Sequence, residues 1–181
     1  MIPLKKISIL ICVFLCTSCY ESLDFKQLNN FVVKPVFTIA LNYFSIVSSS
    51  FINSNGIQQT SISDITDIRG LQDFNIANDI VKMEFNSEIK NEFDRKVTIT
   101  VDLLDETSRL TYSFTAIVVE PQDLKFIYLE AIDIASYPDI LNTSKVKVTA
   151  EIENTDSSLN PEDTSEIEFK SSITLFIETS F

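Results

Sequence analysis

The chain has 181 residues with 14 basic and 26 acidic side chains, and its net charge of −12 argues against a nucleic-acid partner, because phosphate binding needs a basic face. It contains no histidine, and its three cysteines all lie within the first nineteen residues. A Ser-His-Asp or Cys-His centre and a histidine zinc site are therefore excluded. A pair of carboxylates for glycoside hydrolysis is the remaining catalytic alternative, but we predict that the protein is not an enzyme and uses no cofactor.

The first nineteen residues have the order of a secretory signal peptide. Two lysines precede an apolar run from Ile7 to Leu15, which is about half the ~20 residues that a membrane span needs. Thr17 and Ser18 then precede Cys19, which resembles the lipobox of bacterial lipoproteins, although Cys16 stands where that family usually has leucine. We therefore predict cleavage after Ser18 and lipidation of Cys19. The alternative is cleavage at the same bond without lipid.

This interpretation divides the chain into a signal peptide (1–18), a lipidated cysteine with a tether (19–30) and one domain (31–181). Cleavage removes two lysines and leaves 163 residues with a net charge of −14. Such an acidic domain is not attracted to anionic lipid, so the lipid on Cys19 would have to provide the membrane attachment.

The first expected strand covers residues 31–46. It is apolar on both faces, which is typical of a strand that is buried on both sides. Residues 48–78 are polar and lack a strand signal, and we expect one helical turn near 71–77.

The later strands alternate between apolar and polar residues, which is typical of half-buried antiparallel strands. Val101 and Phe114 should point into the core from neighbouring strands, with Asp102 pointing outward. Residues 133–142 are expected to form a short helix that is broken by Pro138. The alternating strands are expected at 81–89, 97–103, 110–118, 124–131, 146–152 and 166–177.

About seven strands at this spacing predict an all-β fold, a single antiparallel β-sandwich that is immunoglobulin-like or Greek-key. An alternative is a small outer-membrane β-barrel, because Phe181 closes an alternating strand. The odd number of strands and the absence of tryptophan argue against the barrel.

The acidic loop before the last strand, residues 154–166, is the best candidate for a metal site. It resembles the EF-hand calcium loop, but Leu159 stands at the glycine position and the closing carboxylate comes one residue late. We therefore expect a solvated loop without a metal ion. The calcium candidates are Asn154, Asp156, Ser158, Asn160 and Glu166.

The chain as a whole resembles the small β-sandwich lipoproteins of Bacteroidota, of the flavobacterial type, in its lipobox, short tether, strand pattern and Asn/Ile/Ser/Phe-rich composition. The resemblance implies a non-catalytic lipoprotein of the cell envelope that acts as a binding or structural accessory module. Its partners would be the membrane, through Cys19, and an outer-membrane complex or an extracellular ligand. Tyr20 follows the cysteine where inner-membrane lipoproteins have aspartate, which favours the outer membrane and leaves its face open. The alternative function is a surface receptor or adhesin for a glycan or protein.

Overall fold

The computed structural model describes residues 32–68, 77–155 and 157–180. The predicted signal peptide and Cys19 lie outside these residues. Residues 33–179 form one compact unit, and this unit contains both large sheets. A short two-stranded ladder joins β1 (Val32–Val33) to β11 (Thr179–Ser180).

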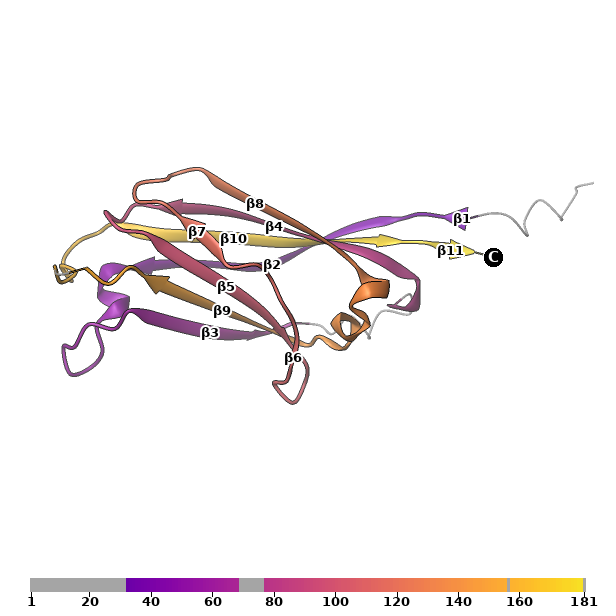
Figure 1. Cartoon of the computed structure of the whole chain (residues 1–181), viewed down its shortest axis with the longest axis horizontal. Coiled ribbons are helices and arrows are strands. Elements are labelled where there is room, and N and C mark those ends of the chain that lie inside the picture. Colours follow the sequence, from indigo (N-terminus) through magenta and orange to yellow (C-terminus); the bar gives the residue numbers. More distant parts are fainter. Residues whose placement is uncertain (1–31, 69–76, 156, 181) are drawn as a thin grey trace, which may run out of the picture. The chain divides into compact units, whose positions relative to one another are not determined.

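Two antiparallel sheets face each other across the core (Figure 1). The four-stranded sheet has the order β2 (Val36–Val47), β10 (Glu166–Ile177), β4 (Ile80–Asn91) and β8 (Phe126–Asp133). The five-stranded sheet contains β3 (Ser61–Asp67), β9 (Lys145–Ile152), β5 (Val97–Leu104), β6 (Leu110–Ser113) and β7 (Ile117–Val119). The predicted all-β sandwich is confirmed.

The strand pairs are nested along the chain. β2 pairs with β10, β3 with β9 and β4 with β8, while β6 and β7 both pair with β5 at the centre of this series. A chain paired in this way is one long hairpin wrapped into two layers, which is the double Greek key of a jelly roll. Of the two predicted topologies, immunoglobulin-like and Greek-key, the strand order therefore matches the Greek key. The two sheets have eight strands if β6 and β7 count as one interrupted strand.

The core lies between the sheets and is built by the alternating residues that the sequence indicates. Val101 and Phe114 are 1% and 3% exposed, so their predicted burial is confirmed. The rings of Phe85 and Phe114 lie 4.2 Å apart between their centroids, which links the two layers. Asp102 points outward and accepts a hydrogen bond from the Ser113 hydroxyl at 2.6 Å.

The prediction of one continuous strand over residues 110–118 is wrong, because β6 ends at Ser113 and β7 begins at Ile117. Between the pairs Asp102–Ser113 and Ile99–Ile117, β5 has two residues where the opposite chain has three. This bulge reverses the faces, because side chains alternate with a period of two. Ile117 is therefore buried and Val118 is 45% exposed, although Val118 was expected inside.

The prediction for the first strand is also wrong. β2 is an edge strand with several exposed apolar side chains, because only β10 pairs with it in its sheet. The polar segment after it was expected to lack strands, yet it contains β3 and a 3-10 helix over Ser48–Phe51. Most of the turn expected near 71–77 lies outside the described residues.

The helix expected over residues 133–142 is present as two short 3-10 helices, Ile134–Ser136 and Pro138–Asn142. The Asp133 side chain caps the first by accepting a hydrogen bond from the Ala135 N–H at 3.2 Å. Pro138 begins the second, where its missing N–H costs nothing.

Candidate functional site

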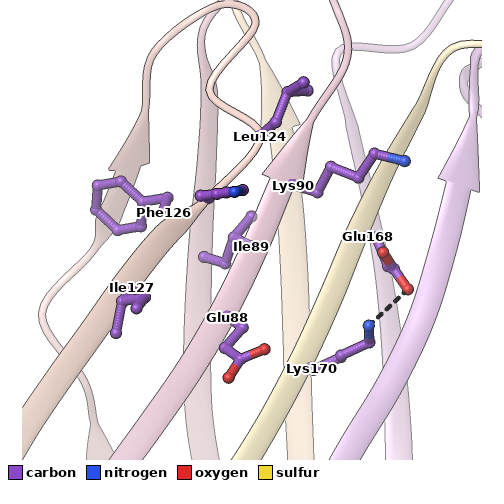
Figure 2. A pocket seen from close by; sticks show the side chains of 9 residues that line it. Glu88, Ile89, Lys90, Leu124, Phe126, Ile127, Glu168 and Lys170 are labelled. Carbon is purple, nitrogen blue, oxygen red and sulfur yellow. Dashed lines mark ion pairs between the residues drawn. The ribbon is translucent and has the colours of Figure 1, made fainter.

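A partly open hollow of about 300 Å³ on the outer face of the four-stranded sheet is the first candidate site (Figure 2). β4, β8 and β10 lie side by side there, because Glu88 pairs with both Ile127 and Lys170 across the ladders. Leu124 and Ile127 are 51% and 70% exposed, so the hollow offers apolar surface beside its charges. Its lining residues are Glu88, Ile89, Lys90, Leu124, Lys125, Phe126, Ile127, Glu168 and Lys170.

Three lysines and two glutamates line this hollow. The lining itself therefore has one more basic than acidic residue, but Glu92 and Glu166, which both pair with Lys90, offset this excess. The Lys170 ammonium lies 2.9 Å from Glu168, and the Lys90 ammonium lies 2.7 Å from Glu92. No ion pair of Lys125 is found within the part of the chain that the structure describes. This lysine is the one most open to an added anion.

The ion pairs keep these groups charged at neutral pH. The hydrogen bond from Lys170 lowers the pKa of Glu168, and the bond to Glu168 raises the pKa of Lys170. Tyr43 on β2 also donates to Glu168 at 3.0 Å, and the Lys170 ammonium lies 5.6 Å from the Tyr43 ring centroid. The hollow thus continues towards a partly exposed aromatic ring.

A second polar cluster joins the two sheets at one side of the sandwich. The carboxylate of Glu130, on β8, accepts hydrogen bonds from the Tyr112 hydroxyl at 2.7 Å, from the Thr115 N–H at 3.0 Å and from the Tyr128 hydroxyl. Burial raises the pKa of Glu130, but the three donors outweigh it and hold the pKa below its usual value. The cluster is half-buried and its acceptors are occupied, which indicates a structural role.

Four of the five calcium candidates lie among the described residues. Glu166 is the first residue of β10 and accepts a hydrogen bond from Ser45 on β2. The side-chain oxygen of Asn160 accepts from the Glu162 N–H at 3.1 Å, so it is used within the loop. Leu159 is buried and anchors the loop. Asn154 and Ser158 are exposed, and Asp156 lies outside the described residues. Among the residues that the structure describes, no three His, Cys, Asp or Glu side chains are grouped so that they could hold a metal ion.

Sequence reasoning missed the hollow and the Glu130 cluster. Its alternation pattern placed Glu88, Glu168 and Lys170 on the outer face, but it did not give the register that brings them together. The bulge after Ser113 could not be read from residue types either, and Tyr112 and Thr115 reach Glu130 from either side of Phe114, where the ladder is interrupted.

No family model and no curated protein matches the sequence. Among solved structures, a candidate secreted protein from Parabacteroides distasonis ATCC 8503 is similar over 64% of this chain and 38% of its own, at 14% identity and a TM-score of 0.48. The VP2 subviral particle of infectious bursal disease virus is similar over 80% of this chain and 32% of its own, at 12% identity and a TM-score of 0.45.

The enzymatically active domain of tailspike protein 4 from bacteriophage CBA120 is also similar, over 80% of this chain and 19% of its own, at 9% identity and a TM-score of 0.38. This chain therefore spans less than two-fifths of each of these structures, and likeness at this level carries no inference about activity. Within the described residues, no helix has the length and apolar character needed to cross a membrane.

Proposed function

We propose that the protein is a non-catalytic, lipid-anchored binding module of the bacterial outer membrane, and that it binds an anionic oligosaccharide in the hollow on the four-stranded sheet. The observation that carries the proposal is the gathering of Lys90, Lys125 and Lys170 beside exposed aliphatic side chains on a strongly acidic protein. Acidic sugars combine carboxylates with apolar C–H faces, and this surface complements both.

Several features support a binding rather than a catalytic role. The chain has no histidine, and its cysteines all precede Tyr20, so the usual nucleophile–base pairs cannot form. The hollow is partly open and its side chains Leu124 and Ile127 are exposed, whereas catalytic sites generally exclude water from the reacting atoms. Ion pairs already hold Glu168 as a carboxylate with a lowered pKa, which makes it a poor general acid.

Calorimetric titration of the full-length protein in detergent with trigalacturonate and with neutral maltotriose tests the ligand class. We expect trigalacturonate alone to bind, with an affinity that falls as salt is added. Lys125→Glu should abolish binding, because it replaces the unpaired cation with an anion. Lys147→Glu, on the outer face of the other sheet, is the matched control and should leave binding unchanged. Equal binding of both sugars, or of neither, would reject the proposal.

The anchor needs a separate test. Two or more acyl chains on Cys19 would hold the protein stably in a membrane, since each buried CH₂ contributes about 0.8 kcal/mol. Cys19→Ala should therefore release the protein from membranes or leave an uncleaved precursor, as seen by fractionation and mass spectrometry. A cleaved Cys19→Ala protein that stays in the membrane fraction would show that Cys19 is not the anchor.

A further inference from the structure

The β2 edge of the four-stranded sheet carries no charged side chain. β2 contains twelve residues, and none of them is ionisable apart from the phenol of Tyr43. Edge strands usually carry charged residues or proline, because their unpaired backbone groups otherwise pair with another chain. Val36, Phe37 and Ile39 are 54%, 49% and 38% exposed, so an apolar strand edge faces solvent here.

The backbone geometry shows which groups point to the open edge. Ile177 donates its N–H to the Pro35 carbonyl at 3.1 Å, so these two residues form a hydrogen-bonded pair of the antiparallel ladder. Hydrogen-bonded and non-hydrogen-bonded pairs alternate in such a ladder. The N–H and C=O groups of Val36, Thr38 and Ala40 therefore point away from β10. An extended chain is the ligand that such a row of donors and acceptors pairs with.

Side chains next to this edge are suited to an added strand. Phe37 and Ile39 pair with the buried residues Leu175 and Ile173, so they lie on the inner face of the sheet but are not covered. Further along β2, a slot of about 130 Å³ opens between the two sheets, large enough for one aliphatic side chain. Its lining residues are Phe44, Ile46, Ile62, Ser63, Asp64 and Val148.

The charges around the edge decide what the added strand can be. Asp64 stands at the slot, Asp67 ends β3, and Glu166 and Glu168 lie on the strand next to β2. Lys34 and Lys170 also lie beside this edge, but each of them pairs with a glutamate, Glu178 and Glu168, so the surroundings stay acidic. A second copy would bring the same carboxylates close to its own, and each copy carries a net charge of −12. Electrostatic complementarity therefore favours a different chain that is neutral or basic.

We propose that β2 binds an extended segment of a partner protein, without acidic residues, which adds as a fifth strand to the four-stranded sheet. Its backbone pairs with Val36, Thr38 and Ala40, and its inward side chains cover Phe37 and Ile39. A one-residue bulge at Leu41 interrupts the ladder, so continuous pairing stops there and only a side chain of the partner reaches the slot beyond. This surface is separate from the hollow and does not depend on the sugar proposal.

The test uses fluorescence anisotropy with full-length protein in detergent and a labelled peptide, Lys-Thr-Val-Thr-Leu-Thr-Val-Thr-Lys, at protein concentrations up to about 1 mM. We expect saturable binding, and no binding of a copy that is N-methylated on its three central amides. Thr38→Pro should weaken binding at least tenfold, since it removes an N–H at the open edge, where proline is tolerated. Thr38→Val is the matched control, because it loses the same hydroxyl contact with Thr174 but keeps the N–H.

Thermal unfolding shows whether the Thr38→Pro variant is folded. If it is not, the Ile39→Lys variant takes its place in the binding test, and we expect it to weaken peptide binding by the same factor of ten. Absence of peptide binding, equal binding of the N-methylated copy, or loss of binding in Thr38→Val would each overturn the proposal. Sedimentation of the unmodified protein and of the Thr38→Pro variant tests whether the edge joins two copies of this chain. A dimer that Thr38→Pro dissociates would assign the edge to a second copy and overturn the commitment to a different partner.

Discussion

The two long sides of the sandwich are closed in different ways. Where β8 meets β6 and β7, Glu130 accepts three hydrogen bonds, two of them from Tyr112 and Thr115 on the opposite sheet. Where β2 meets β3, no hydrogen bond joins the two strands among the described residues, and an apolar slot is left open. One side is therefore bonded across the layers, and the other presents surface that a ligand could cover.

The two sides therefore differ in what a substitution is expected to change, either the free energy of unfolding or the binding of a partner. A carboxylate whose donors are all in place strengthens the contact between two sheet edges, and it would be costly to disturb. An uncharged edge without cross-links adds little to stability, so its residues can be chosen for a partner. We therefore expect substitutions in the Glu130 cluster to change unfolding and substitutions at the open edge of β2 to change association with a partner strand.

The largest effect is expected at Phe114, beside the bonded side. Phe114→Ala removes a ring that packs on Phe85 and Tyr112, and it should lower the free energy of unfolding by about 3–5 kcal/mol. Urea denaturation followed by circular dichroism measures the change. A loss below about 1 kcal/mol would contradict the packing between the two layers.

The Glu130 cluster should give the next largest effect. Glu130→Gln replaces one acceptor oxygen with a donor, so one of the three donors loses its partner, at a cost of about 1–3 kcal/mol. Glu151→Gln is the matched control, because Glu151 is exposed on the outer face of β9, and it should change stability by less than about 0.5 kcal/mol. Equal costs for the two variants would remove the distinction between the two sides.

Alkaline pH should weaken the bonded side. Burial, followed by the hydrogen bond to Glu130, raises the pKa of Tyr128 to about 12 and also raises that of Tyr112. A raised pKa means that the folded state favours the protonated phenol. The stabilisation is therefore complete below pH 10 and is lost as the pH rises from 10 towards 12. Tyrosinate absorbance should show two phenols that ionise late, and Glu130→Gln should move both to lower pH.

The smallest effect on stability is expected at the open side. Ile39→Thr exchanges a partly exposed side chain and should change the free energy of unfolding by about 0.5 kcal/mol or less. The same urea titration measures it, so the value is directly comparable with that for Phe114→Ala. A cost above about 2 kcal/mol would mean that Ile39 is covered in solution and that the β2 edge is not free.

The sequence predicts more of the core than of the surface sites. The alternation over 97–103 and 166–177 gives the buried faces of β5 and β10, because a period of two directly assigns side chains to faces. Bulges break this assignment, since one extra residue reverses every later face. That is why Val118 was placed on the wrong side and why the route from Thr115 to Glu130 was not foreseen.

Edge position is the other property that residue types did not reveal. β2 is as apolar as a central strand, and only its place in the sheet order shows that it has one neighbour. The hollow depends in the same way on strand order, because Glu88 and Lys170 are far apart in the sequence and adjacent only through the pairing of β4 with β10.

The nested pairing also affects when the chain can fold. β10 lies between β2 and β4, so the first long strand waits for a partner more than a hundred residues away, as between Val47 and Glu166. Contacts at such separation make folding slow, in milliseconds to seconds for β-rich domains, because a long loop must close first. The chain is synthesised from its amino-terminal end. Its four-stranded sheet therefore lacks β10 until nearly the whole chain has been made. During this interval the apolar strand β2 has no partner in its sheet and is exposed to other chains.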